Sequence, residues 1–310
     1  MDDPALIRLV SSAAALVVVA AACFGGFAVR GSTALPAAMW AALAGIVLAV
    51  EFGCRGCGVL ADPAAAEGVR LAATALGLCP AMSLLGAKRP QHGVWQFIVA
   101  ALAGMLALPA ATAVLARPGE VPDVHGLQRW FMVLLVLVGW MNFAGTRHGF
   151  AAAVVTVGQL VLMRPFLPLL PPAAETPWGD FVATLLVAGG SLAAAAITAF
   201  WPVTAGGHRG LAAGIDAPFL ALRETLGAAW TLRIAERFNA TAETRGWPCR
   251  LRFAGLERGG DAVDSAWHRD AVRCLRALLL RFVSPGWLER HGAGSRDPHP
   301  PAVARAAERE

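Results

Sequence analysis

The stretch DAPFLALRETLGAAWTLRIAERFNATAET, residues 216–244, separates a strongly apolar part of the chain from a polar and basic one. Asp216 and Pro218 are typical of a helix start, and Gly246 followed by Pro248 is typical of a helix end. Its apolar residues recur at steps of three and four, which places them on one helix face: Phe219, Leu222, Leu226, Trp230, Ile234 and Phe238. The sequence therefore predicts one long amphipathic helix whose apolar face must be buried against something.

The composition of the 310-residue chain is that of a membrane protein. Hydrophobic residues make up 57% of it and charged residues 15%, and the mean hydropathy is +0.57. Such values lie outside the range of soluble globular proteins. The net charge is +5, but the basic residues are not interleaved with aromatic ones, so we expect no nucleic-acid partner. Tyrosine is absent, which excludes a tyrosine acid, base or nucleophile.

Seven apolar runs precede the amphipathic stretch. A helix needs about 20 apolar residues to cross the ~30 Å hydrocarbon core of a bilayer. The fifth and sixth runs are short and are separated only by residues 146–149, so they can instead form a re-entrant pair. We predict an all-α polytopic membrane protein with a bundle at residues 1–204 and about seven transmembrane helices, at residues 9–29, 34–50, 69–86, 94–116, 130–145, 150–163 and 181–201.

The interiors of these predicted spans contain no Asp, Glu, Lys or His. Ion-coupled transporters keep such groups deep in the bilayer, so the pattern argues against coupled transport, and the lack of paired histidines argues against a b-type haem. Small residues recur every four positions in several spans, which is typical of close helix packing or of a homodimer: Ala41, Gly45, Ala49 and Gly53; Ala73, Gly77 and Ala81; Gly189 and Ala193; Gly190 and Ala194.

The loops predict a multi-pass protein of the plasma (inner) membrane with its C-terminal part in the cytoplasm. The loops on one side carry Arg30, Lys88, Arg89 and Arg147, are very short and contain no acidic residue. The basic tail lies on that same side. The loops on the other side contain more arginines, mixed with acids, so a count of Lys and Arg alone points the other way.

Residues 205–291 are predicted to form a soluble, basic helix–strand–helix module. Residues 249–253 (CRLRF) alternate apolar and charged side chains, as a half-buried strand does. This strand has no evident partner within the chain, so its edge can accept a strand from another protein. A second amphipathic helix from Asp264 to Val283 carries Arg269, Arg273 and Arg276 opposite its apolar face. Residues 292–310 are expected to be disordered.

The motif Cys54-Arg-Gly-Cys57 follows the second run. Two cysteines at this spacing can be a redox dithiol, a disulfide, half of a metal site, or simply small residues at a membrane boundary. The other cysteines offer no matching second pair for zinc, and Gly58 in place of a histidine excludes haem attachment.

Charged residues gather near the end of the second run. Glu51 lies four residues before Arg55, the spacing at which two side chains meet on one helix face. Arg70 can join them in a charged cluster at the membrane surface, either as an interfacial ion pair or as a contact for a substrate carboxylate or a headgroup.

Two short basic turns lie on the predicted side of the module, at residues 86–92 and 146–149. Turns of this kind commonly only set the topology, but together with the amphipathic helices they can also bind a lipid headgroup, a phosphate or a partner. The candidate binding residues are Lys88, Arg89, His92, Arg147, His148, Trp230, Arg269, Arg273 and Arg276.

The segment Leu222-Arg-Glu-Thr-Leu-Gly-Ala-Ala-Trp230 follows a span and a Pro-Phe pair. It resembles a segment that wax-synthase-type membrane acyltransferases carry near their active site. The pattern of that family is Trp-Gly-Arg-Arg-Trp-Asn, followed by a membrane-embedded histidine, and Gly227 and Trp230 are the two residues that match it here. The resemblance implies a lipid-modifying acyltransferase, with His291 as the candidate for the histidine.

These features favour a non-enzymatic membrane protein that acts as an anchoring, assembly or accessory subunit. Its expected partners are the lipid bilayer and, through the C-terminal module, a protein or a second copy of the chain, with no cofactor and no metal. The alternatives are an uncoupled transporter or channel-like protein, and a lipid-modifying membrane enzyme. A water-filled path lined by Asn142, Gln159 and Arg147 would favour transport, whereas a buried histidine facing a lipid-sized cavity would favour an enzyme.

Overall fold

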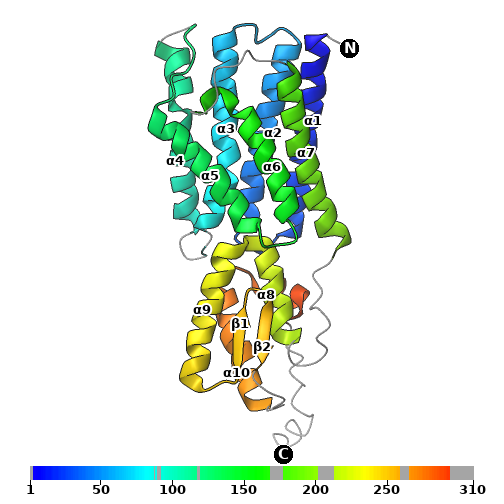
Figure 1. Cartoon of the computed structure of the whole chain (residues 1–310), viewed down its shortest axis with the longest axis vertical. Coiled ribbons are helices and arrows are strands. Elements are labelled where there is room, and N and C mark those ends of the chain that lie inside the picture. Colours follow the sequence, from blue (N-terminus) through cyan, green and yellow to red (C-terminus); the bar gives the residue numbers. More distant parts are fainter. Residues whose placement is uncertain are drawn as a thin grey trace, which may run out of the picture.

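The computed structural model describes residues 3–86, 88, 92–116, 119–167, 177–201, 213–258 and 265–293. Long, roughly parallel helices form a bundle, and a smaller unit, the C-terminal module, lies against one end of it (Figure 1). The N-terminus lies at the opposite end of the bundle (Figure 1).

The bundle is made of α1 (Pro4–Ala28), α2 (Leu35–Gly56), α3 (Pro63–Leu85), α4 (His92–Ala116), α5 (Gly126–Phe143), α6 (Gly149–Leu162) and α7 (Pro177–Phe200). Six of these helices are long and apolar enough to cross a membrane, which confirms an all-α membrane protein. The seventh, α6, has 14 residues and therefore a length of about 21 Å. A 3₁₀ turn, Arg164–Phe166, follows it.

Several helices extend beyond the apolar runs from which they were predicted. Asp62 starts α3 ahead of its run, because its carboxylate accepts hydrogen bonds from the backbone N–H groups of Ala64 and Ala65. As a result Glu51, Arg70 and Asp180 lie within helices that are long enough to span a membrane. Glu51 and Asp180 lie near the ends of their helices and outside the apolar runs 34–50 and 181–201, so the expectation that the interiors of the spans contain no Asp, Glu, Lys or His stays a prediction.

Six helices follow one another around a ring. α1 packs against α2 and α7, α2 against α3, α3 against α5, α5 against α6, and α6 against α7, while α4 packs on the outside of α3 (Figure 1). Close approach of α6 and α7 requires glycine on both helices: a Cβ atom on Gly158 or Gly190 would lie 2.8 Å from a backbone oxygen of the other helix.

The C-terminal module contains α8 (Ala213–Leu226), α9 (Ala228–Arg245), β1 (Cys249–Arg252), β2 (Gly255–Arg258), α10 (Ser265–Leu279), α11 (Pro285–Leu288) and a π-helical turn, Glu289–Ala293. The prediction of one long helix is wrong, because the chain breaks at Gly227, where φ is 79° and ψ is −168°. The strand also has a partner within the chain: β1 and β2 form an antiparallel hairpin in which Leu251 faces Leu256.

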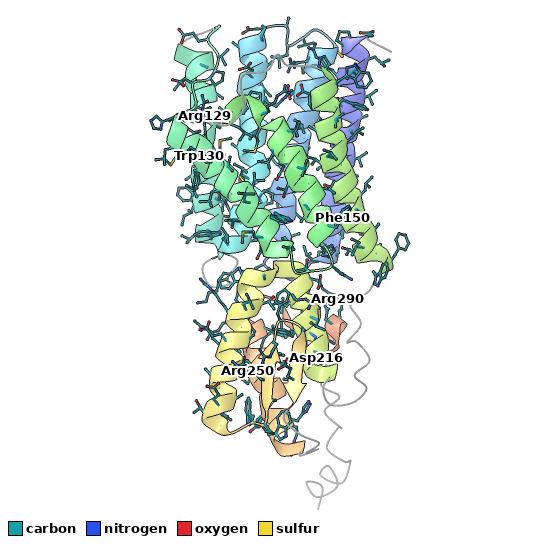
Figure 2. All side chains as sticks on the ribbon, in the orientation of Figure 1. Arg129, Trp130, Phe150, Asp216, Arg250 and Arg290 are labelled. Atoms are coloured by element: carbon teal, nitrogen blue, oxygen red, sulfur yellow. The ribbon has the colours of Figure 1, made fainter. Side chains whose placement is uncertain are left out.

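The predicted cap at Asp216 has a different role. The helix begins three residues earlier, at Ala213, and the buried Asp216 carboxylate accepts a hydrogen bond of 2.7 Å from the backbone N–H of Leu256 in β2 (Figure 2). Asp264, the predicted start of the second helix, and residues 294–310 of the expected disordered tail lie outside the described residues.

The apolar core of the module is continuous with the bundle. The predicted apolar faces of the amphipathic helices meet inside it, with Phe219, Phe238 and Leu275 almost fully buried. The same cluster includes Ala34 and Leu84 from the bundle. The module and the bundle therefore share one apolar core, because α2 and α3 contribute side chains to the core of the module.

Candidate functional site

A cavity of about 440 Å³ lies inside the helix ring. All six ring helices contribute to its wall, which is formed mainly by small and apolar side chains. The predicted stripes of small residues explain its position: alanine and glycine leave the centre of the ring unfilled. The stripe residues in the wall are Ala41, Gly45, Ala73, Gly77, Ala81, Gly190 and Ala194.

The cavity is long and narrow. Its wall residues on the α6 side run from His148 to Met163, about 22 Å at the rise of an α-helix. Two wall residues, Leu85 on α3 and Trp140 on α5, are also exposed on the surface of the bundle, and both lie toward the module. Polar side chains are sparse in the described wall and comprise Arg70, Thr74, Asn142, His148, Thr156, Gln159 and Ser191, besides the indole of Trp140.

Arg70 lies at the end of the cavity that is far from the module, in a buried cluster of charges. Its Nε and Nη2 donate to the two carboxylate oxygens of Glu51, both at 2.8 Å. Its Nη1 and Nη2 donate to Asp180 at 2.9 and 3.0 Å. Arg55 adds an ion pair to Glu51 at 3.2 Å. The cluster joins α2, α3 and α7 at this end of the ring.

The burial of this cluster exceeds what the sequence suggested. Glu51 is 0% exposed and Arg70 is 1% exposed, and the guanidinium of Arg70 also lies 4.9 Å from the centre of the Phe52 ring. Because both carboxylates bind the same guanidinium in a bidentate manner, the charges are compensated inside the protein. Arg70 therefore has a structural role here rather than a free cationic group for a ligand.

His148 lies at the opposite end of the cavity, next to the module. Its Nε2 is 3.4 Å from Nε of Arg147, and its buried Nδ1 has no hydrogen-bond partner among the described residues. Burial lowers the pKa of His148 below the usual 6.5, and the positive charge of Arg147 lowers it further, against the opposing effect of Glu224. The ring is therefore neutral at pH 7.

The tautomer of this neutral ring follows from its neighbour. Arginine has only donor groups, so Nε2 of His148 must accept the hydrogen bond from Arg147 and carries no proton. The proton of the ring then lies on Nδ1. His148 thus has a ring N–H that is buried without a hydrogen-bond partner among the described residues.

Asn142 connects this end of the ring to the module. Its Nδ2 donates to the backbone oxygen of Leu226 at 2.9 Å, and its Oδ1 accepts from the backbone N–H of Ala229 at 3.0 Å. One side chain of α5 thus binds the last carbonyl of α8 and one of the first N–H groups of α9, and Gly227 has no side chain that could do so.

Further hydrogen bonds join the module to the turns of the bundle. Glu224 accepts a hydrogen bond of 3.0 Å from the backbone N–H of Arg147, and its side chain is 4% exposed. The indole of Trp230 donates to the backbone oxygen of Leu84, at the end of α3, at 2.7 Å. Arg147 also donates to the backbone oxygen of Trp201. These contacts involve the ends of α3, α5 and α7.

The turn between α1 and α2 is bound to the other side of the module. The backbone N–H of Thr33 donates to Phe282 at 2.9 Å, and that of Ser284 donates to Gly31 at 2.7 Å. Arg290 donates to the backbone oxygen of Arg30 at 2.8 Å, and Figure 2 shows it where the module meets the bundle. The apolar face of the predicted amphipathic helix is therefore covered by the chain itself.

The predicted binding residues fall into three groups. Arg147, His148 and Trp230 lie at the junction between the bundle and the module. Arg269 and Arg273 are exposed on α10, Arg276 is partly exposed, and Arg273 binds Asp270, whose pKa it lowers. Lys88 is partly exposed, whereas Arg89 and the side chain of His92 lie outside the described residues.

The cysteine motif lies at the end of α2. Cys54 is partly exposed, Cys57 is exposed, and both are free thiols. Within the described residues, no three His, Cys, Asp or Glu side chains lie close enough together to hold a metal ion.

The residue implied by the acyltransferase resemblance lies in the module, not in the ring. His291 stacks on Trp287 with 3.9 Å between ring centres, and its Nδ1 lies 2.8 Å from the Trp287 backbone oxygen. Gly227 and Trp230, the two matching residues, serve the contact between module and bundle.

The sequence analysis did not identify two residues that the structure places at these sites, Asp180 and Glu224. It identified Gly227 only through the acyltransferase resemblance and not as the break between two helices. An acidic residue at the start of an apolar run is a signal that could have identified Asp180.

Comparison of the chain with protein-family models, with curated proteins and with solved structures gives no match.

Proposed function

We propose that this protein holds a membrane-soluble molecule in the cavity of its helix ring. The observation that carries the proposal is the cavity of about 440 Å³ with an apolar wall and a few polar groups, which is the usual composition of a small-molecule site. The Glu51–Arg70–Asp180 cluster closes one end of the ring, and the module covers the other. Leu85 on α3 and Trp140 on α5 line the cavity and are exposed on the surface of the bundle, so we propose that the molecule enters beside them.

Binding fits this cavity better than catalysis does. A histidine facing a lipid-sized cavity was expected to favour a lipid-modifying enzyme, because such a histidine can act as a general base. The atom of His148 that is buried without a partner is Nδ1, and the contact with Arg147 puts the proton on this atom. A nitrogen that already carries a proton does not act as a general base toward a ligand.

The proposed setting is the plasma (inner) membrane, with the module in the cytoplasm and α6 inside the bilayer as the seventh helix of the bundle. The absence of acidic residues from the short loops beside the module supports this orientation. α6 is shorter than a typical span, but it is packed between α5 and α7 within the ring.

Filling the cavity is expected to abolish binding. A Cβ atom on Gly77 meets only Nε2 of Gln159, at 3.7 Å, so Gly77→Phe should fold and place its ring in the cavity. Gly104 on α4 has open space around it, so Gly104→Phe is a matched change on the outer surface. Native mass spectrometry of protein purified with its own lipids should show a bound small molecule in the wild type and in Gly104→Phe, but not in Gly77→Phe. Equal retention by both variants would rule the cavity out.

A second candidate function, as an anchoring or assembly subunit, is favoured by the exposed arginines of α10. One end of α10 lies at the side of the module that is far from the bundle (Figure 1), where a protein partner can reach it. Reversing Arg269, Arg273 and Arg276 to glutamate in the full-length protein should abolish co-purification of an acidic partner. Its control is Arg250→Glu, an exposed arginine on β1. An unchanged set of co-purifying proteins would count against this role.

A further inference from the structure

Two arginines share one carboxylate where the module meets the bundle. Glu224 lies between Arg147 and Arg223, and two guanidinium groups with one carboxylate leave an excess of one positive charge. Oε1 of Glu224 accepts hydrogen bonds from Nη2 and Nε of Arg223 at 2.6 and 2.9 Å. Nε of Arg147 lies 3.7 Å from Oε2, which is beyond hydrogen-bond distance. The excess charge therefore lies chiefly on Arg147.

The end of the Arg147 side chain is open to a ligand from outside the protein. The side chain is 24% exposed. Its Nε makes a partly buried contact with His148, whereas Nη1 donates to the backbone oxygen of Trp201 at the exposed surface. Nη2 has no hydrogen-bond partner among the described residues. The guanidinium thus keeps free N–H donors, and the planar fork of an arginine matches the oxygens of a phosphate.

The surroundings of Arg147 are typical of a membrane surface. Trp201, Phe200 and Phe150 are largely exposed, and Figure 2 shows Phe150 at the end of the bundle that faces the module. Exposed tryptophan at the end of a membrane helix is typical of the level of the lipid headgroups. Because Arg147 binds the backbone of Trp201, its guanidinium lies at this level.

An apolar surface continues from this level along α6. Phe150 and Val157 are both exposed, and their spacing of seven residues places them on one face of the helix. An acyl chain can lie along this face while the headgroup of the same lipid meets Arg147.

We propose that Arg147 binds the phosphate of an anionic phospholipid whose acyl chains lie against α6. The excess charge favours a lipid with a net negative charge over a zwitterionic lipid, which brings an ammonium group of its own. The site is separate from the cavity, because Arg147 is not among the described residues of the cavity wall. Glu224 of α8 holds the backbone N–H of Arg147, so the site is complete only when the module is docked.

Retention of lipid by the full-length protein tests this site. The protein is placed in nanodiscs with equal parts of phosphatidylglycerol and phosphatidylcholine that carry the same acyl chains, and native mass spectrometry identifies the lipids that stay bound after release. The wild type should prefer phosphatidylglycerol, and Arg147→Gln should lower this preference roughly fivefold. Arg147→Lys, which keeps the charge, should retain most of it. The matched control is Arg164→Gln, a partly exposed arginine at the other end of α6, which should behave as the wild type does.

A second variant changes the preference in the opposite direction, which a folding defect cannot do. Glu224→Gln keeps the size of the side chain and an oxygen that can accept from the backbone N–H of Arg147, but it removes the only carboxylate that Arg147 is shown to contact. The preference for phosphatidylglycerol should therefore rise roughly fivefold.

The remaining outcomes would overturn the proposal. Equal retention of the two lipids by the wild type, or an unchanged preference in Arg147→Gln, would show that Arg147 does not select an anionic lipid. Isothermal titration of inorganic phosphate into the lipid-free protein in neutral detergent should show no binding. Binding of phosphate that Arg147→Gln abolishes would assign the site to a soluble phosphate compound instead of a lipid.

Discussion

Replacing Arg70 with methionine is expected to destabilise the folded protein by about 3–5 kcal/mol, because it leaves the buried carboxylate of Glu51 and the partly exposed one of Asp180 without their common cation. Glu51 is 0% exposed and its carboxylate receives two hydrogen bonds from Arg70. Asp180 receives two more. The free energy of unfolding, measured by denaturant titration in mixed micelles, is the test.

The quadruple variant Glu51→Leu, Arg55→Met, Arg70→Met and Asp180→Leu is the informative control, because it removes Arg55 together with its partner Glu51. Replacing a whole buried ion cluster by apolar side chains is often neutral or stabilising. Most of the stability lost in Arg70→Met should therefore return. A loss below about 1 kcal/mol in Arg70→Met would mean that the carboxylates are hydrated or neutral, and would contradict the buried cluster.

The Gly227→Ala variant is expected to detach the module from the bundle. The backbone conformation at Gly227, with φ 79° and ψ −168°, is one that only glycine adopts readily, and strain of this kind alone costs about 1–3 kcal/mol. The added Cβ atom would also lie 2.5 Å from the backbone oxygen of Asn142 and 2.6 Å from its Cγ. Hydrogen exchange of the amides in α8, α9 and the turn at residues 31–33 should therefore increase together.

Gly246→Ala is the matched control for this change. Gly246 also has a positive φ, 66°, but a Cβ atom there meets nothing within 4 Å, so only about 1 kcal/mol of strain is expected. Asn142→Ala should show a weaker version of the Gly227→Ala effect, because it removes two hydrogen bonds without adding a clash. Unchanged exchange at residues 31–33 in Gly227→Ala would contradict the docked arrangement.

Much of the fold can be predicted from the sequence, because the helices follow from the local pattern of apolar residues. Apolar runs predicted the six helices that are long and apolar enough to cross a membrane, since a membrane helix is defined by its length and hydropathy. The predicted ends of these helices agree less well with the structure than their predicted positions do. Asp62 extends α3 by a side-chain cap, and residues such as Glu51 and Asp180 continue a helix despite their charge, because Arg70 compensates them inside the protein.

Only part of the candidate site could be predicted from the sequence. The stripes containing Gly77 and Gly190 were identified, but periodicity alone predicts that small residues face a neighbour and not whether that neighbour is a helix or a cavity. His148 was identified as part of a basic turn. Its role depends on Arg147 occupying Nε2, which is a matter of three-dimensional geometry.

The sequence by itself determined that this is a helical membrane protein with an amphipathic C-terminal stretch, because hydropathy and period are properties of neighbouring residues. Only the tertiary structure decided what covers the apolar face of that stretch, where the chain breaks within it, and which charges are buried. The break at Gly227 illustrates the reason: a glycine in a helical pattern is ordinarily tolerated, and it becomes a break only because Asn142, 85 positions earlier in the chain, supplies the missing hydrogen bonds.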